Sequence, residues 1–125
     1  MKLRIQEDVL RFRLTQTEVA QLRDLGRVES RTKFAPGRAL VYRLESSENA
    51  RWVRANFDDS VISVTVPAEI VSGWANSDQV GIEAPSQAGG QLLIEKDFKC
   101  LHKPADRDPD AYPNPLAGVR ERLAG

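Results

Sequence analysis

The only cysteine and the only histidine of the chain, Cys100 and His102, lie two residues apart. On a strand they would share one face, with Asp97 shortly before them and three aspartates after them. A thiolate and an imidazole suit a soft or borderline metal, and the same pair suits covalent catalysis. However, a zinc site usually contains paired C-x-x-C or H-x-x-x-H elements, which this sequence lacks. We therefore expect no metal and no cofactor, and favour a buried structural thiol beside a half-exposed imidazole.

A second group of residues that could bind a ligand is a series of arginines near the N-terminus. Arg4, Arg11 and Arg13 alternate with apolar residues, so they should project from two strands away from the core. Arg31 is expected to extend the same surface. Guanidinium groups arranged in this way can bind phosphate or carboxylate groups. The alternative is a solvated strand face that discourages edge-to-edge aggregation.

Motifs of the common enzyme classes are absent from the sequence. It contains no P-loop, no G-x-G-x-x-G, no G-x-S-x-G and no H-E-x-x-H. We favour a protein that is not an enzyme. The alternative is a small enzyme or ligand-binding protein in which Lys96, Asp97, Cys100 and His102 converge on a pocket at the end of the last strand.

The charge of the chain is balanced overall but unevenly distributed. Its 125 residues carry 18 basic and 18 acidic side chains, so a general attraction to DNA or to an anionic membrane is not expected. Residues 1–49 carry 10 basic and 7 acidic side chains (+3), residues 50–98 carry 3 and 7 (−4), and residues 99–125 carry 5 and 4 (+1). No apolar stretch reaches the ~18 residues of a transmembrane helix, and no signal peptide is expected. We predict a cytoplasmic protein, which a single cysteine also fits.

The strongest internal signal is a repeat of the apolar pattern at an offset of 52 residues. Leu10 falls on Ile62, for example, and Leu40 falls on Leu92. Identical residues are few, so a chance resemblance is the alternative. The pattern favours a duplicated unit.

Each copy, at about residues 2–46 and 54–98, is predicted to contain two strands, a short helix and two further strands. In the first copy, KLRIQ and LRFRL alternate as strands do, and Thr15-Gln16-Thr17-Glu18 is a helix capping box. Each β-β-α-β-β unit has a bare apolar sheet face, which the other copy can bury. We expect an α+β, β-rich single domain over residues 1–125, built as a pseudo-twofold barrel or sandwich.

The C-terminal segment, residues 99–125, is rich in proline and aspartate. Four prolines between Pro104 and Pro115 disfavour helix and sheet, so the backbone should run extended. We predict a strap over the surface, anchored by Tyr112 and Leu116, followed by a short terminal helix. Such a strap covers an exposed edge of the fold or engages a partner.

Two steps in the second copy have a characteristic form: Val66-Pro67-Ala68-Glu69 leads from a strand into a helix, and Ser77-Asp78-Gln79-Val80-Gly81-Ile82 leads into the next strand. This run resembles the swapped-hairpin domain of AbrB-like and MazE-like bacterial regulators, in which two short chains exchange hairpins to form one barrel. The resemblance implies a fused pseudo-dimer here. In that family the first hairpin contacts DNA, but the second copy has almost no basic residues on its first hairpin.

A second resemblance lies at the C-terminal end. Lys96-Asp97-Phe98-x-Cys100-Leu101-His102, Ala111-Tyr112-Pro113-Asn114-Pro115-Leu116 and the M-K-L-R start resemble a small bacterial protein family of unknown function. The resemblance spans nearly the whole chain and implies no activity or ligand. It marks Lys96, Asp97, Cys100 and Asn114 as residues of interest.

Together, these features predict a cytosolic binding or regulatory module without enzymatic activity. Its partner would be a protein or an anionic ligand, held by the arginine-bearing surface or by the C-terminal segment. DNA is less favoured as a partner because the net charge is zero.

Overall fold

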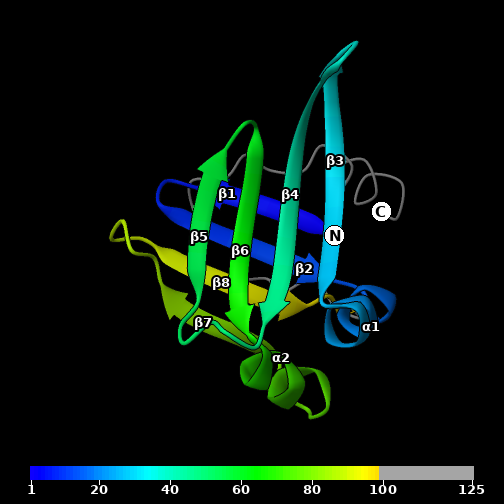
Figure 1. Ribbon diagram of the computed structural model, residues 1–125, viewed down its shortest axis with the longest axis vertical. Coiled ribbons are helices and arrows are strands. Elements are labelled where there is room, and N and C mark those ends of the chain that lie inside the picture. The colour runs from blue at the N-terminus through cyan, green and yellow to red at the C-terminus, as the bar shows by residue number, and fades with distance from the viewer. Residues whose placement is uncertain (99–125) are drawn as a thin grey trace, which may run out of the picture.

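The computed structural model describes residues 1–98, which form eight strands and two helices (Figure 1). Along the chain these are β1 (Lys2–Gln6), β2 (Val9–Leu14), α1 (Gln16–Leu25), β3 (Arg27–Ala35), β4 (Arg38–Ser47), β5 (Arg54–Asp58), β6 (Val61–Pro67), α2 (Ala68–Ala75), β7 (Gly81–Pro85) and β8 (Gln91–Lys96). The predicted α+β, β-rich class is confirmed. The strap and the terminal helix predicted for residues 99–125 lie outside the described residues.

The strands pair into four antiparallel hairpins, β1–β2, β3–β4, β5–β6 and β7–β8. The first and third hairpins have the same pairing register at an offset of 52 residues, and so do the second and fourth. The corresponding opposed pairs are Lys2–Arg13 and Arg54–Thr65, and Glu29–Arg43 and Gly81–Glu95. Hairpins 52 residues apart in the chain therefore share their pairing register.

The hairpins combine into two four-stranded sheets. Sheet A has the order β1-β2-β8-β7 and sheet B has the order β3-β4-β6-β5, each with one parallel pair at its centre. The two parallel pairs differ in register by two residues, because Leu10 lies beside Leu92 whereas its counterpart Ile62 lies beside Tyr42 rather than Leu40. Each sheet keeps two edge strands within residues 1–98, so the pairing there does not close into a barrel.

The inner faces of the two sheets share one hydrophobic core. Figure 1 shows the strands of sheet B crossing in front of those of sheet A at a steep angle. Phe12 and Ile94 from sheet A, and Leu44 and Val64 from sheet B, are at most 1% exposed and belong to one cluster. Because side chains alternate along a strand, the residues between these positions point away from the core. The fold therefore presents two outer faces, one on each sheet.

Helix α1 begins and ends as its sequence predicts. The capping box is formed, with the Glu18 N–H donating to Thr15 Oγ1 at 3.3 Å and the Thr15 N–H donating to Glu18 Oε1 at 2.9 Å. The helix ends at Gly26, whose φ of 78° is left-handed and suits glycine. These caps fix α1 between β2 and β3.

Helix α2 follows β6 directly, as the sequence step at Pro67 predicts. Pro67 ends β6 and is the N-cap residue of the helix, without a side-chain capping bond. The helix is held instead by Trp74, which is fully buried and donates from Nε1 to the Val80 carbonyl at 3.1 Å. Within residues 1–98, neither helix has the length and apolar character needed to cross a membrane.

Candidate anion-binding face

The outer face of sheet A carries four cations in two opposed pairs. On β1 and β2, Lys2 lies directly opposite Arg13 and Arg4 lies directly opposite Arg11. All four alternate with inward residues such as Phe12, so they share the outer face. The sequence predicted this placement for the three arginines.

These cations are only partly neutralised by carboxylates. Glu95 of β8 lies 3.4 Å from Arg11 Nε and 3.8 Å from Arg13 Nε, so one carboxylate serves both guanidinium groups. Arg4 donates to Gln6 Oε1 at 3.1 Å and forms no ion pair with any residue in 1–98. The Arg11 Nε is buried and, despite its proximity to Glu95, has no hydrogen-bond partner of good geometry within the described chain. The face therefore retains unused capacity to donate hydrogen bonds to an anion.

A hollow of about 340 Å³ lies on this face between Arg4 and Arg11. Its other lining residues are Gln6, Glu7, Val9, Gln91 and Leu93. Val9 and Leu93 are the apolar residues of its lining. The hollow thus combines an apolar contact with two guanidinium groups.

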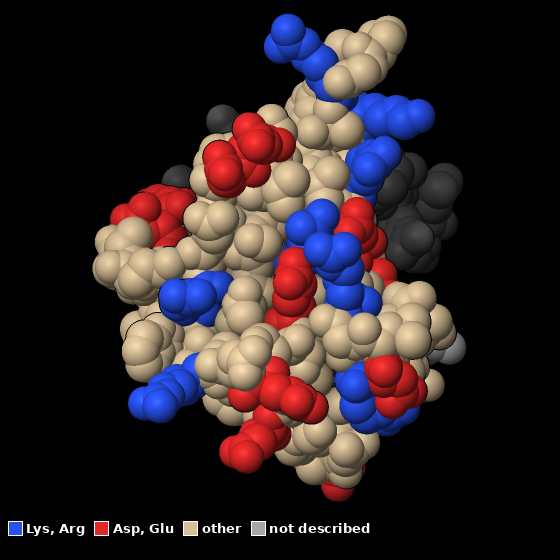
Figure 2. All heavy atoms as spheres, viewed as in Figure 1, with Lys and Arg blue, Asp and Glu red and all other residues tan. Residues whose placement is uncertain are grey.

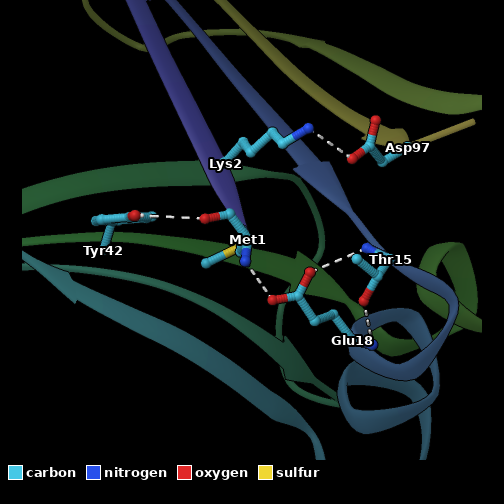
Figure 3. Close-up of polar contacts among 6 residues, drawn as sticks. All are labelled: Met1, Lys2, Thr15, Glu18, Tyr42 and Asp97. Carbon is cyan, nitrogen blue, oxygen red and sulfur yellow. Dashed lines mark hydrogen bonds and ion pairs between the residues drawn. The ribbon is translucent and has the colours of Figure 1, made fainter. Parts of the chain in front are cut away.

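A second hollow lies where β1, β2 and β8 meet α1, and it contains Lys2, Arg13, Arg23 and Asp97 in its lining. Figure 3 shows how residues at this end are held. Lys2 Nζ pairs with Asp97 Oδ2 at 3.0 Å, which ties β1 to the segment after β8. The cationic surface therefore continues from the Arg4–Arg11 hollow to the end of the sheet.

The N-terminal residue links this end of sheet A to α1 and to sheet B (Figure 3). The Met1 ammonium pairs with Glu18, and the Tyr42 hydroxyl donates to the Met1 carbonyl at 3.3 Å. Burial alone would raise the pKa of Glu18, but hydrogen bonds from the Met1 ammonium and from Thr15 outweigh it and lower this pKa below its ordinary value of 4.5. Glu18 is therefore a structural carboxylate that fixes the start of β1.

Arg31 does not extend the surface formed by Arg4, Arg11 and Arg13, because it projects from the outer face of sheet B. The core separates the two outer faces. Figure 2 shows the sheet B face, on which basic and acidic side chains interleave over β3 and β4. These include the pairs Arg27–Glu45 and Arg43–Glu29, both at 3.2 Å. The described structure therefore assigns the predicted arginines to two different surfaces.

The chain was compared with known proteins. A model of a family of unknown function (DUF7009) matches residues 1–116. The chain belongs to this family. Neither the curated proteins nor the solved structures gave a match. The predicted membership in an unknown-function family is confirmed, and the comparisons add no link to the AbrB and MazE regulators.

In this DUF7009 member, Lys96 and Asp97 lie at the end of β8 as predicted, but their charged ends diverge. Lys96 Nζ donates to the Ser77 carbonyl at 2.7 Å and lies 5.8 Å from the centre of the Trp74 ring. Asp97 turns instead to Lys2 on the outer side. Consecutive residues of a strand point to opposite faces, which explains the divergence. The other three predicted residues, Cys100, His102 and Asn114, lie outside the described residues.

Sequence reasoning missed three residues on the outer face of sheet A: Lys2, Leu93 and Glu95. Lys2 alternates in phase with Arg4, so the same pattern could have included it. Leu93 and Glu95 come from β8, which is separated from β2 by most of the chain. Only the parallel pairing of β2 with β8 brings them beside Arg11 and Arg13.

Proposed function

We propose that this chain is a non-enzymatic binding module that holds an extended acidic protein segment on the outer face of sheet A. The supporting observation is the placement of Lys2 opposite Arg13 and of Arg4 opposite Arg11. Like charges directly opposite each other destabilise an antiparallel pair. These pairs have two carboxylates, Asp97 beside Lys2 and Glu95 shared by Arg11 and Arg13, so the surface is suited to a further anion from outside the sheet.

The spacing of the cations fits alternate side chains of an extended peptide. Arg11 and Arg13 are two residues apart on β2, which is about 6.6 Å along a strand. Every second side chain of an extended acidic segment repeats at the same ~6.6 Å. Arg4 lies directly opposite Arg11, with its Cβ atom about 5 Å to the side. Successive carboxylates of the peptide can thus each bind one guanidinium group, and each pair can be bidentate.

A protein segment is favoured over DNA as the partner. Duplex DNA binding depends on releasing counterions from many phosphates, and therefore requires an extensive basic surface. The chain has no net charge, and the outer face of sheet B mixes both signs. The apolar part of the hollow's lining suits a peptide side chain better than a sugar-phosphate backbone. It consists of Val9 and Leu93.

We further infer that the architecture is one domain built from a duplicated swapped-hairpin unit, similar to a fused pair of AbrB-like or MazE-like chains. Two observations support this proposal. Hairpins 52 residues apart have equal registers, and each sheet takes one hairpin from each copy. The two sheets would then form a pseudo-twofold sandwich around the shared core. In such a pair only the first copy carries the cationic outer hairpin.

The proposed binding can be tested by fluorescence anisotropy, with a labelled peptide of alternating aspartate and alanine titrated with the full chain. The same titration is run on a chain carrying Asp106→Asn, Asp108→Asn and Asp110→Asn, because carboxylates within the chain would compete with the peptide. We expect saturable binding that weakens with salt and falls about tenfold or more when Arg4→Gln and Arg11→Gln are combined. The matched control is Arg54→Gln, on the outer face of the equivalent hairpin, and should leave affinity unchanged.

Three results would overturn the proposal. They are an absence of binding to both chains, equal affinity for an asparagine-alanine peptide, and equal loss of binding in the Arg54→Gln control. Tighter binding of random duplex DNA than of the acidic peptide would replace it with a nucleic-acid function.

A further inference from the structure

One apolar side chain on the outer face of sheet A is buried. Leu93 lies beside Arg11 and opposite Glu83, so it projects outward, yet it is only 6% exposed. It does not belong to the core cluster between the sheets. Its cross-strand neighbours on this face, Arg11 and Glu83, are charged, and the aliphatic stem of an arginine can cover an adjacent leucine. The centre of this face therefore offers an apolar contact beside a guanidinium group.

We infer that residues 104–116 of the same chain are the resident occupant of this face, docked along the Arg4–Arg11 hollow. The inference rests on the proposed function, since it uses the same cations, and it names the acidic segment that they hold. An external acidic partner would then bind by displacing this segment.

The charge pattern of the segment matches the face. Asp106, Asp108 and Asp110 occupy alternate positions, so an extended backbone places their carboxylates on one side. Their repeat of about 6.6 Å equals that of Arg11 and Arg13 on β2. The carboxylates would supply the ion-pair partner that Arg4 lacks within residues 1–98 and the acceptor that the buried Arg11 Nε lacks there.

The segment also has the required reach and apolar content. Asp106 is eight positions after Phe98, enough to span about 26 Å. The distance along β2 from Leu14, where β8 ends beside it, back to Arg11 is only about 10 Å. Tyr112 follows the aspartates and can cover Leu93. The family match continues through residue 116, so the segment belongs to the unit that defines the family.

Paramagnetic relaxation measured by NMR tests this placement directly in the full chain. A nitroxide is attached at Ala105→Cys in a Cys100→Ser background, so that none of the aspartates is changed. We expect strong signal loss at amides of β1, β2 and β8, and much less at β5 and β6. Reversal of Arg4 and Arg11 to glutamate should abolish the loss. Equal signal loss at the amides of all strands, or no signal loss at any of them, would overturn the inference.

A mixture of labelled and unlabelled protein shows whether the docked segment comes from the same chain or from a second copy. When spin-labelled unenriched protein is added to ¹⁵N-enriched protein without a label, signals should remain unchanged. Signal loss in that mixture would assign the segment to a second copy and overturn docking within one chain.

A second readout does not depend on the label. Trypsin should cleave after Arg107 about tenfold faster when Arg4 and Arg11 are changed to glutamine, because docking protects the site and the residues beside the cleaved bond stay the same. The variant with Asp106, Asp108 and Asp110 changed to asparagine should bind the acidic peptide more tightly than the unmodified chain. If the unmodified chain and the asparagine variant bind the peptide equally, and the substitutions do not change the rate of cleavage after Arg107, this inference fails while the proposed function stands. If neither chain binds the peptide, the proposed function fails.

Discussion

The two outer faces of this protein use charge in opposite ways. On sheet B, Arg27 lies opposite Glu45 and Glu29 lies opposite Arg43, so each cross-strand pair joins opposite charges. On sheet A, the first hairpin places cation opposite cation at both of its charged positions. The sheet B pattern stabilises its own strands, whereas the sheet A pattern does not.

The equivalent hairpin of sheet B strengthens this contrast. At the positions of Lys2, Arg4, Arg11 and Arg13, the β5–β6 hairpin has Arg54, Asn56, Ser63 and Thr65. Both hairpins have the same register and bury their alternate residues in the same core. The fold therefore fixes the inner residues of both hairpins and leaves the outer ones free. The cations of sheet A are a property of the surface and not a requirement of the fold.

The largest effect should come from an inner residue of the same strand. Phe12→Ala removes a fully buried aromatic ring and should lower the free energy of unfolding by about 3–5 kcal/mol. Arg13→Ala, on the adjacent outer position, should change it by less than about 1 kcal/mol. Urea denaturation of both variants measures the difference. Comparable losses would show that the outer cations are part of the folding core.

The next effect concerns the carboxylate that anchors the start of sheet A. Because the folded pKa of Glu18 lies below 4.5, its contribution is fully present above pH 4.5 and is lost as pH falls through the folded pKa. Glu18→Gln should therefore destabilise the protein by about 1–2 kcal/mol at neutral pH and by progressively less as pH falls below 4.5 and through the folded pKa. Denaturation over a series of pH values checks this. A pH-independent loss would argue against an ionic role for Glu18.

A smaller effect is expected from the ion-pair network on sheet B. Arg43 lies 3.2 Å from Glu29 and 3.6 Å from Glu45, so Arg43→Ala should destabilise the protein by up to about 1 kcal/mol. Arg4→Ala breaks no ion pair within residues 1–98, and in a chain carrying Asp106→Asn, Asp108→Asn and Asp110→Asn it should leave stability unchanged or slightly raise it at low salt. Thermal unfolding of the two variants compares the faces directly. Equal destabilisation would remove the contrast between them.

The smallest effect would come from copying the sheet A pattern onto sheet B. Asn56→Arg combined with Ser63→Arg places two guanidinium groups opposite each other on β5 and β6. We expect a loss of about 0.3 kcal/mol that disappears at high salt, because the repulsion is exposed and screened. Melting temperatures at low and high salt measure it. A stabilised variant would contradict the assumption that such pairs oppose folding.

Much of the local structure could be predicted because it depends on local patterns. Alternation in KLRIQ and LRFRL predicts both strands and the inward position of Phe12. Thr15 and Glu18 predict the start of α1, because their side chains cap backbone N–H groups three residues away. The site was predicted in part, since the outward position of Arg4, Arg11 and Arg13 follows from the same alternation. Family membership also followed from sequence patterns.

The sequence by itself determined which segments are strands, which residues they bury, and that a proline-rich segment with three alternate aspartates follows them. Only the tertiary structure decided which hairpins share a sheet, and thereby that Glu95 and Leu93 stand beside Arg11 while Arg31 lies on the other side of the core. The physical reason is that a strand's periodicity fixes its own two faces. Its neighbour in the sheet is chosen by burying apolar faces that are far apart in the chain.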